Sequence, residues 1–318
     1  MSYFSNRRYS LRRIAVCFSL GILSTIVPTG TPSAHAQAQP PTKKPTPIPQ
    51  PRKVELATKD GVELSGVYFG SNKGKDAIPV LIVHEWKGQK APYGPLCVTL
   101  QRAGCAVLAF DYRGHGGSRE YTDQRGEKQE FKIETMRRRS VNEITQIDME
   151  TAKKFFKEEN NAGNLNLNAL VVIGIREGCV IGTNWTHIDW MYPSVGSRKQ
   201  GQDVKALVMI SPKRQVQGVS IDQSLNDPNI GRLPTMLIYG KGSSEQSDTD
   251  RIQKLLEVNK RRFSGNRTAE GLEVSEIGEP LGGAALVNGQ STVIPSIVKF
   301  ITENVKVGED HTQWIERD

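Results

Sequence analysis

The sequence Ala169-Leu170-Val171-Val172-Ile173-Gly174-Ile175-Arg176-Glu177-Gly178 decides the fold of this chain. Its first half is a continuous run of apolar residues. Such a run is typical of a strand whose two faces are both covered by other elements. The run passes at once into a segment framed by Gly174 and Gly178. Because active sites in parallel sheets lie beyond the carboxyl ends of the strands, we look for function in this segment and its neighbours.

Further apolar runs on either side of this strand predict a whole sheet. Strands at residues 54–56 and 62–68 should form an antiparallel hairpin, because Lys59-Asp60-Gly61 between them is a strong turn signal. Strands and helices alternate from there on, which predicts an α/β protein with a mainly parallel, doubly wound sheet of about eight strands. The other strands are expected at residues 79–83, 106–110, 206–210, 235–239 and 272–277, the last of them nearer an edge.

Three helices can also be located. We expect one over residues 93–103 and a closing one over residues 292–305. The third, residues 140–159, has an apolar stripe at helical spacing. Ser140 and Glu143 form a capping box that predicts where this helix begins.

The first 36 residues have the composition of a secretory signal. Four arginines form a basic region, residues 14–27 are apolar, and Ala34-His35-Ala36 has the small-x-small form that signal peptidase recognises. The apolar run is shorter than the roughly 20 residues that a spanning helix needs, so we prefer cleavage after Ala36 to a retained anchor. We therefore predict an exported protein, periplasmic or secreted, with no integral membrane span after cleavage. Arg7-Arg8 also resembles a twin-arginine signal.

The rest of the chain divides into three parts. Residues 37–52 are rich in proline and polar side chains, cannot build a core, and are predicted to form an extended linker. The folded domain is expected over residues 53–307. The tail at residues 308–318 is expected to be frayed, although Trp314 and Ile315 could dock.

Charge and cysteine content exclude several classes of function. The whole chain has a formal charge of +8, and the predicted signal contributes four arginines and no acids, so the mature chain carries 8 − 4 = +4. So mild an excess gives no case for nucleic-acid binding. Cys97, Cys105 and Cys179 remain in the mature chain, and their odd number and wide spacing favour neither a disulfide framework nor a metal site. We expect three buried free thiols, no metal and no cofactor.

Three loops that follow predicted strands carry most of the conspicuous motifs. They resemble, in order and spacing, those of the α/β-hydrolase family, and most closely its compact, lidless members such as dienelactone hydrolases and serine-aminopeptidase-like enzymes. The resemblance covers about residues 54–305 and implies the α/β-hydrolase fold without a large lid. It also implies that the second loop shapes a turn beside the pocket. The loops are His84-Glu85-Trp86-Lys87-Gly88, Asp111-Tyr112-Arg113-Gly114-His115-Gly116-Gly117-Ser118 and Gly174-Ile175-Arg176-Glu177-Gly178.

The same resemblance shows which catalytic groups are missing. In the family the third loop reads Gly-x-Ser-x-Gly, a tight turn that presents the nucleophile and whose next N–H joins the oxyanion hole. Arg176 stands at the nucleophile position, and a guanidinium stays protonated and cannot attack a carbonyl. Glu177 supplies the next N–H. Ser243 stands where the acid is expected, and Glu245 or Asp248 could reach in, although both are out of frame.

The histidine position is degenerate as well. The segment at residues 278–285, which includes Gly283, stands where the resemblance places the histidine, and no histidine occurs between residues 188 and 310. Three departures within an intact frame predict a protein without ordinary hydrolase chemistry.

Other side chains offer less favoured replacements for the missing groups. Cys179 follows the elbow but should pack inside its helix. Ser211 and Ser243 lie in loops that face the pocket, but neither has a histidine nearby in sequence. His84 matches the histidine of the oxyanion loop and His115 belongs to the turn, so both are expected to be structural. A working pair built from these two histidines is the weaker alternative.

Two roles are open for Arg176. A helix N-terminus favours anions, so Arg176 with Lys87 would form a site for a carboxylate or phosphate. We favour the other role, in which Arg176 pairs with an acid and plugs the pocket, because an unpaired buried guanidinium is costly. The acids near it in sequence terms are Glu85, Glu177 and Asp111. The pocket itself is expected to be lined by His84, Glu85, Trp86, Lys87 and Glu177.

Three functions are compatible with these observations. The favoured one is an exported α/β-hydrolase-like protein with a degenerate triad that acts by binding, with a small anionic molecule as its ligand. The second is an active ester or peptide-bond hydrolase with relocated catalytic groups. The third is a structural or interaction protein of the cell envelope that uses residues 37–52 as a spacer.

Overall fold

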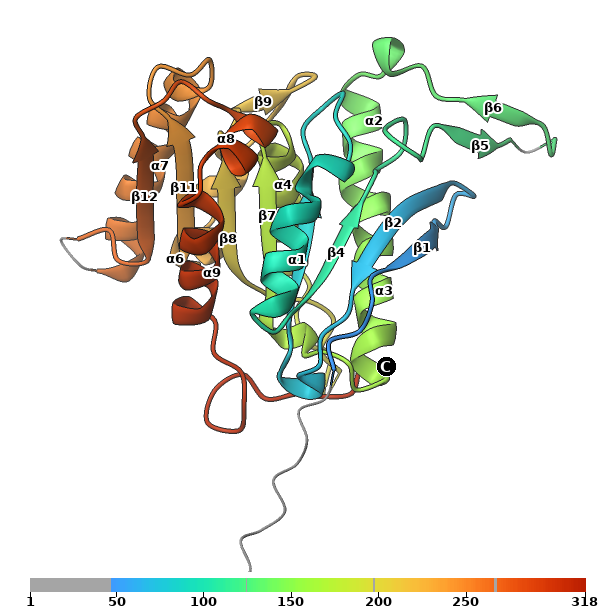
Figure 1. Cartoon of the computed structure of the whole chain (residues 1–318), viewed down its shortest axis with the longest axis horizontal. Coiled ribbons are helices and arrows are strands. Elements are labelled where there is room, and N and C mark those ends of the chain that lie inside the picture. Colours follow the sequence, from blue (N-terminus) through green and yellow to red (C-terminus); the bar gives the residue numbers. More distant parts are fainter. Residues whose placement is uncertain (1–46, 124, 197, 266–267) are drawn as a thin grey trace, which may run out of the picture. The chain divides into compact units, whose positions relative to one another are not determined.

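The computed structural model describes residues 47–123, 125–196, 198–265 and 268–318. Its main sheet consists of β1 (Arg52–Ala57), β2 (Glu63–Phe69), β3 (Ile78–Val83), β4 (Cys105–Phe110), β7 (Leu170–Ile175), β8 (Val204–Ile210), β11 (Thr235–Gly240) and β12 (Leu272–Ile277). The order across the sheet is β1-β2-β4-β3-β7-β8-β11-β12 (Figure 1). The strands from β4 to β12 pair in parallel, and the hairpin of β1 and β2 is antiparallel at one edge.

The strands form where the apolar runs predicted them. Every residue of β3, β4, β7 and β11 is buried, as a parallel strand covered on both faces requires. β12 has no fully buried residue and forms an edge of the sheet, which confirms its predicted position. The prediction of a mainly parallel, doubly wound α/β sheet of about eight strands is confirmed.

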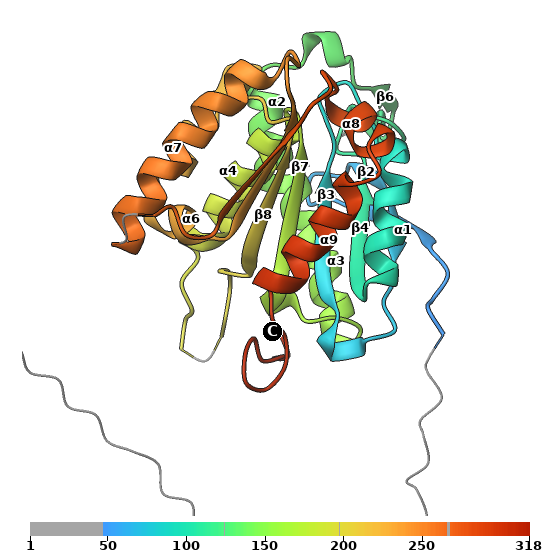
Figure 2. The same ribbon diagram turned by 60° about the vertical axis from the view of Figure 1, so that its left-hand side comes forward.

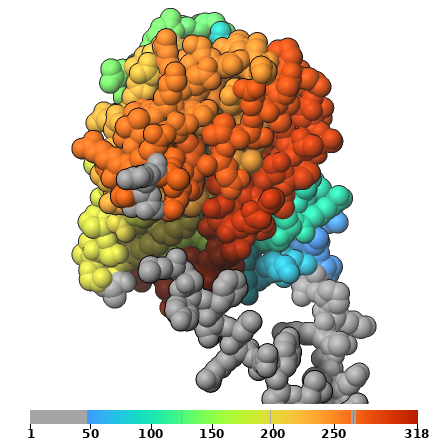
Figure 3. Space-filling model, turned by 90° about the vertical axis from the view of Figure 1, so that its left-hand side faces the viewer, coloured from blue at the N-terminus to red at the C-terminus, as the bar shows by residue number. Residues whose placement is uncertain are grey.

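Helices cover both faces of the sheet (Figure 2). One core cluster joins the sheet to Leu100 and Phe300, and a second joins the opposite face to Phe156, Trp185 and Leu256. The first face is covered by α1 (Gly94–Arg102) and α9 (Val293–Asn304), and the second by α3 (Met149–Asn161), α4 (Gly178–Met191) and α7 (Gln246–Ser264). Seen from the β12 edge, the surface belongs largely to the orange and red C-terminal part of the chain (Figure 3).

The helix predicted at residues 140–159 begins earlier and is not continuous. α2 (Arg138–Glu143) starts after Arg137, whose side chain makes no cap. A π turn at Ile144–Asp148 then leads into α3. Such a turn inserts a residue into the helical ladder and re-aims the side chains next to it.

The capping box predicted for this helix is wrong. Glu143 does not reach back to Ser140, because its carboxylate accepts a hydrogen bond from Nε of Arg139 at 2.9 Å and lies 3.9 Å from Nη1 of Arg113. Two cations therefore compete successfully for the group that should have capped the helix. Arg113 also contacts Asp148 at the end of the π turn, where its Nε donates a hydrogen bond to Oδ1 at 2.9 Å.

Only short elements decorate the sheet, and no large lid is inserted in the residues that the structure describes, as the family resemblance predicted. β5 pairs with β6 and β9 with β10, each as an antiparallel hairpin. The remaining elements contain few residues each. These elements are β5 (Glu120–Thr122), β6 (Lys128–Glu130), β9 (Gln215–Val216), β10 (Val219–Ser220), α5 (Asp222–Leu225), α6 (Pro228–Arg232) and α8 (Gly283–Gly289).

The C-terminal tail docks on the domain, so the expectation of a frayed end is wrong. The ammonium of Lys75 lies 3.5 Å from the ring centroid of Trp314. Arg317 is buried, and its Nη2 donates to Oδ1 of Asn168 at 2.7 Å. The side chain of Ile315 remains exposed. Of the two apolar residues that the sequence offered for docking, Trp314 makes a contact, and the rest of the docking depends on polar contacts with distant parts of the chain.

The predicted signal at residues 1–36 and the first part of the linker lie outside the described residues. Export and cleavage therefore stay predictions. Within the part of the chain that the structure covers, we find no helix with the length and apolar character needed to cross a membrane.

Candidate functional site

The turn after β7 is sharp and strained. Arg176 has φ of 51°, in the left-handed region that non-glycine residues rarely occupy. Its N–H donates to the carbonyl of Ile210 at 2.9 Å, and its carbonyl accepts the N–H groups of Cys179 at 3.1 Å and Lys213 at 3.2 Å. α4 begins two residues later, at Gly178. This is the geometry of a nucleophile elbow, and it presents one side chain at the carboxyl end of a central strand.

Close backbone contacts require the two glycines of the elbow. A Cβ on Gly178 would lie 2.2 Å from the carbonyl oxygen of Val83 and 2.4 Å from that of His84. A Cβ on Gly174 would lie 2.6 Å from the Cα of Cys179. These are backbone atoms that cannot swing aside, so only glycine permits β3, β7 and α4 to approach this closely.

The guanidinium of Arg176 pairs with a buried carboxylate. Its Nη2 lies 2.6 Å from Oε1 of Glu245, and the side chain of Arg176 is 35% exposed whereas that of Glu245 is 1% exposed. Oγ of Ser244 donates to the same oxygen at 2.5 Å, and Nζ of Lys213 lies 3.7 Å from it. Arg176 is therefore the main counter-ion of an acid that has almost no access to water.

This partner differs from those that the sequence suggested. Glu85, Glu177 and Asp111 were expected to pair with Arg176, and that expectation is wrong. Oε2 of Glu85 accepts a hydrogen bond from the hydroxyl of Tyr93 instead. The partner immediately precedes α7, and two strands of the main sheet, β8 and β11, lie between it and Arg176 in the sequence. Nearness along the chain was a poor guide, because the sheet order brings β7 and β11 to either side of β8.

Glu245 also supplies the carboxylate at the end of β11, where the sequence placed Ser243. Oγ of Ser243 is buried and has no hydrogen-bond partner among the described residues. The N–H of Ser243 donates to the carbonyl of Gly240 at 3.1 Å, and Gly242 has φ of 75°. This turn carries the chain around so that Glu245, two residues later, faces Arg176. Counting residues in the family frame missed it.

The loop at the histidine position closes over the same pair. A Cβ on Gly283 would lie 3.0 Å from Cδ of Arg176, and one on Gly282 would lie 2.4 Å from Oε2 of Glu245. The N–H of Gly283 donates to Oγ of Ser211 at 3.0 Å. The three positions at which the resemblance implies a nucleophile, an acid and a histidine thus converge in space. They hold arginine, glutamate and glycine.

A carboxylate reaches the oxyanion loop. The backbone N–H of Trp86 donates to Oε2 of Glu177 at 3.3 Å. In this kind of elbow, an N–H from the loop after the third strand and the N–H of the residue after the nucleophile form the oxyanion hole. The N–H of Trp86, in the loop after the third strand, therefore already has a side-chain acceptor.

His84 and His115 lie together beneath these loops and are closed to solvent. Nδ1 of His84 donates to the carbonyl of Glu85 at 2.8 Å, and its ring stacks on Tyr112 with centroids 4.2 Å apart. Nδ1 of His115 donates to the carbonyl of Arg113 at 3.0 Å. Burial lowers the pKa of His84 and lowers the pKa of His115 to about 3. Both rings are neutral packing groups at neutral pH.

Lys87 faces another part of the surface, and Trp86 is partly buried against the core. Lys87 is exposed, has φ of 64°, and lines a hollow of about 340 Å³ together with Arg119 and Glu130. Arg176 does not line this hollow. The ring of Trp86 packs edge-on against that of His115, with centroids 4.7 Å apart. The two residues predicted to bind an anion therefore do not both line this hollow.

The second loop is a structural turn. Nη1 of Arg113 donates to Oδ2 of Asp60 at 2.7 Å, and its Nη2 donates to Oδ1 of Asp148 at 2.6 Å. Oγ of Ser118 donates to the carbonyl of Asp111 at 2.6 Å. These bonds tie the loop to the β1–β2 hairpin and to the π turn. The role that the resemblance implied for this loop agrees with its contacts.

Cys97, Cys105 and Cys179 are buried free thiols, which confirms the prediction. Burial raises the pKa of Cys97 and of Cys105 to about 12 and raises that of Cys179 as well. A thiol held in its protonated form is a poor nucleophile, so Cys179 does not replace the missing serine. Among the described residues, no three or more His, Cys, Asp or Glu side chains are grouped so as to hold a metal ion.

Sequence reasoning missed a second group of serine, histidine and aspartate near the end of α4. Nδ1 of His187 lies 3.4 Å from Oγ of Ser224, and its Nε2 lies 3.5 Å from Oδ2 of Asp227. The Ser224 hydroxyl donates to Oδ1 of Asn184 at 2.7 Å and is nearly inaccessible. In a hydrolytic triad the acid binds Nδ1 and the serine faces Nε2, so the order here is reversed. These residues come from separate elements, and no spacing in the sequence links them.

Solved hydrolases have a similar fold. An esterase of Pyrococcus furiosus matches with a TM-score of 0.56 and 17% sequence identity, over 80% of this chain and 91% of its own. A dienelactone hydrolase from Anabaena variabilis matches with a TM-score of 0.55 and 14% identity, over 81% of this chain and 100% of its own. At such low identity the likeness shows the fold alone.

Sequence comparison reaches only part of the chain. No protein-family model matches it. An uncharacterized protein of Mycobacterium tuberculosis strain H37Rv is 38% identical over 71 residues, which are 22% of this chain and 25% of that protein. This chain thus covers about a quarter of the length of its curated relative, and no activity is carried over from it.

Proposed function

We propose that this chain, which has the α/β-hydrolase fold, is a binding protein without hydrolase activity. The ion pair of Arg176 and Glu245 carries the proposal, because it fills the nucleophile position with a permanently protonated side chain. Attack on a carbonyl carbon requires an electron-pair donor at this point, and a guanidinium offers none. We therefore take Arg176 as a plug of the site at the elbow.

The surrounding groups support the same proposal. Within the residues that the structure describes, no histidine forms a hydrogen bond or ion pair with Arg176, Glu245 or Ser211. Ser211 lies beside the pair, but its oxygen accepts the N–H of Gly283. Glu177 occupies an N–H of the oxyanion loop. At the elbow, the described residues therefore provide neither a general base nor a free N–H from the oxyanion loop.

The ligand of such a protein is a separate question. The sequence suggested a small anion bound by Arg176 and Lys87. Glu245 already compensates the charge of Arg176 from a buried position, which disfavours a second anion at the same guanidinium. We propose that the chain binds a small anion at a site other than Arg176.

The test of the inactive elbow is hydrolysis of p-nitrophenyl acetate by the purified protein. We expect a rate equal to that of buffer, unchanged in Ser211→Ala, Ser243→Ala, Cys179→Ala and His84→Ala. Turnover by the parent that any one of these substitutions abolishes would overturn the proposal.

Arg176→Ser sharpens this test, with Arg176→Ala as its matched control. The serine variant restores the nucleophile type at the elbow but supplies neither a base nor a free oxyanion N–H. We expect both variants to remain inactive. Turnover by Arg176→Ser but not by Arg176→Ala would show that a base lies within reach, which contradicts the argument.

One observation favours a second function, an ester hydrolase with relocated catalytic groups. It is the contact of His187 with both Ser224 and Asp227. The reversed order of these contacts and the bond from Ser224 to Asn184 weigh against it. If this function holds, Ser224→Ala and His187→Gln will each abolish turnover while Ser211→Ala leaves it intact.

We also propose that the chain is exported. The basic region, the apolar run and the Ala34-His35-Ala36 site at residues 1–36 support this. Cell fractionation of the full chain should find a shortened protein outside the cytoplasm. Replacing Arg7 and Arg8 with lysine should block this only if the signal is of the twin-arginine type. A full-length product that stays in the cytoplasm would contradict export.

A further inference from the structure

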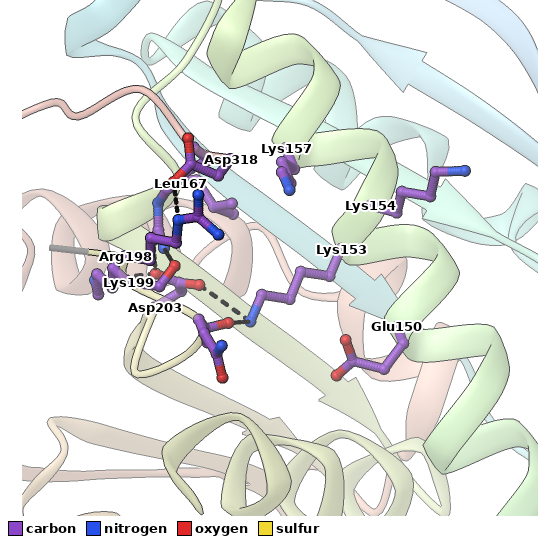
Figure 4. A pocket seen from close by; sticks show the side chains of 11 residues that line it. Glu150, Lys153, Lys154, Lys157, Leu167, Arg198, Lys199, Asp203 and Asp318 are labelled. Atoms are coloured by element: carbon purple, nitrogen blue, oxygen red, sulfur yellow. Dashed lines mark hydrogen bonds and ion pairs between the residues drawn. The ribbon is translucent and has the colours of Figure 1, made fainter. Parts of the chain in front are cut away.

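A charged pocket lies beside the amino ends of β7 and β8 (Figure 4). Its lining includes Leu167, which shortly precedes β7, and Asp203, which immediately precedes β8. Arg176 instead follows the carboxyl end of β7. A strand of this length spans about 20 Å, at roughly 3.3 Å per residue. The pocket is therefore separate from the plugged site.

The pocket has the size of a small-molecule site and a positive lining. Its volume is about 480 Å³, which is within the usual range for such sites. Six basic and three acidic side chains line it. Asp189 does not line the pocket but pairs with Lys153, so it counts as a fourth acid, and the excess is 6 − 4 = 2 positive charges. The basic residues are Lys153, Lys154, Lys157, Arg198, Lys199 and Arg317, and the acidic ones are Glu150, Asp203 and Asp318.

The floor of the pocket is a buried network around Asp203. Nζ of Lys199 lies 2.9 Å from its Oδ1, Nζ of Lys153 lies 3.1 Å from its Oδ2, and Nη2 of Arg317 also contacts Oδ1. Figure 4 shows Lys153 reaching across from α3 to this carboxylate. Burial acts against the charged form, yet the cations outweigh it and hold the pKa of Asp203 below its usual range. Three cations thus share one carboxylate, and Lys153 alone has a second, Asp189, at 2.5 Å.

The network leaves donors and charge without a partner. Nη1 of Arg317 donates to the carbonyl of Lys199 at 2.7 Å, and its Nη2 contacts Asn168 and Asp203, but its buried Nε has no acceptor among the described residues. Lys157 lines the pocket and has no ion pair or hydrogen bond with any described residue. Burial lowers the pKa of Lys199, so its charged form gains from any further anion nearby. The pocket therefore has a hydrogen-bond donor and positive charge for which the described part of the protein supplies no acceptor or counter-ion. An oxyanion ligand would supply both.

We propose that this pocket binds a small polyanion through its phosphate or carboxylate groups, with Lys157 and Arg317 as the main contacts. A guanidinium presents fixed N–H donors that match the oxygens of such groups, and the mobile ammonium of Lys157 adds charge. Arg317 belongs to the C-terminal tail, so the ligand also holds the tail on the domain. The proposal does not depend on whether the elbow is inert.

Thermal unfolding of the purified protein tests the proposal with pyrophosphate and citrate as probes. Sodium chloride at matched ionic strength is the control for screening. We expect either probe to raise the melting temperature by about 5 °C at a concentration a hundredfold above its Kd. Sodium chloride should not do so. Equal shifts with the probes and with sodium chloride would overturn the proposal.

Charge-matched variants locate the site. Lys157→Gln should weaken pyrophosphate binding about tenfold by titration calorimetry, because it removes one charged contact. Lys254→Gln removes an equally charged, exposed lysine from α7 and should have no effect. Arg176→Ala should have none either.

Two results would overturn the assignment of the site. One is equal affinity in the parent and Lys157→Gln, and the other is a loss confined to Arg176→Ala, which would place the anion at the elbow. Arg317→Gln should also weaken binding. That variant can also release the tail, so Lys157→Gln, whose lysine has no contact to lose, decides the question.

Discussion

Arg176 and Glu245 share one ion pair but not one environment. The side chain of Glu245 is 1% exposed, whereas that of Arg176 is 35% exposed. Removal of the arginine leaves a buried carboxylate with only Ser244 and the more distant Lys213 beside it. Removal of the glutamate leaves a guanidinium that can turn toward water. A charge without a partner costs more when it is buried, so the two losses should be unequal.

We predict that Arg176→Met lowers the free energy of unfolding by about 3 kcal/mol and Glu245→Gln by about 1 kcal/mol. Urea denaturation of the two single variants and the double variant measures this. The double variant should cost about 1 kcal/mol or more less than the sum of the single ones, because the residues are in contact. Equal losses, or additive ones, would contradict the unequal burial of the pair.

Glu245 also shows what single-residue reasoning lacked. The sequence identified the correct loop for the acid, since the order of strands fixes which loop follows β11. It could not say which side chain enters the site, because the turn at Gly242 decides how far the chain advances before α7 begins. Ser243 was the residue in frame, and Glu245 is the residue in contact.

At the scale of elements, the elbow is a joint between β3, β7 and α4. The room at this joint is limited at Gly178, where a Cβ would lie 2.2 Å from the carbonyl oxygen of Val83 at the end of β3 and 2.4 Å from that of His84 in the loop after it. Relief would require the helix to move away from the sheet. The contacts that would then be lost include the packing of α4 against β3 and β7.

We therefore predict that Gly178→Ala destabilises the protein by about 3 kcal/mol or more. Gly278→Ala is the matched control, because nothing lies within 4 Å of its Cβ position and its φ is not positive. That substitution should change the unfolding free energy by no more than about 0.5 kcal/mol. Chemical denaturation of both variants is the measurement, and a tolerated Gly178→Ala would refute the packing argument.

Elements were predictable where one local pattern governs them. β12 occupies the expected residues, and the other parallel strands differ by one or two residues at their ends. The capping box failed because α2 begins at Arg138, which places Ser140 inside the helix, and because Arg139 and the more distant Arg113 hold the carboxylate of Glu143. Arg113 comes from another loop, and a pattern of four neighbouring residues holds no information about it.

For the whole molecule, buried histidines predict sensitivity to acid. His84 and His115 are neutral in the folded state because burial lowers their pKa, to about 3 in the case of His115. The unfolded chain takes up protons near pH 6.5, where the folded one does not. Between these values the unfolded state binds more protons, so stability falls as pH falls. Asp148 acts in the opposite direction, since burial raises its pKa to about 6.

We predict that His115→Gln flattens the pH dependence of stability below pH 6.5. The contribution of His115 approaches a slope of about 1.4 kcal/mol per pH unit once the pH is well below 6.5. The parent should therefore lose about 2.3 kcal/mol more than the variant between pH 6.5 and pH 4.5, whatever Asp148 adds to both. Urea midpoints at these two pH values measure the difference. Parallel curves would show that His115 titrates normally.

The tail belongs to this scale because its partners are far away in sequence. Arg317 binds Asn168, 149 residues earlier. Neither end of that contact is conspicuous on its own: one is an arginine in a polar tail and the other an asparagine before a strand. The topology that brings them together was predictable, but the seat of the tail at the amino edge of the sheet was not. The anion pocket escaped notice for the same reason.

The glycines of the elbow have a practical consequence for the discovery of enzymes. Gly174 and Gly178 are fixed by clearance from backbone atoms, and that requirement is the same whether serine or arginine stands between them. A screen that collects esterases by glycine spacing would retrieve this chain alongside enzymes that carry serine at the same position. Such a screen detects only how closely a strand and a helix are packed. It should also score which residue stands between the glycines and how deeply the carboxylate that faces this residue is buried.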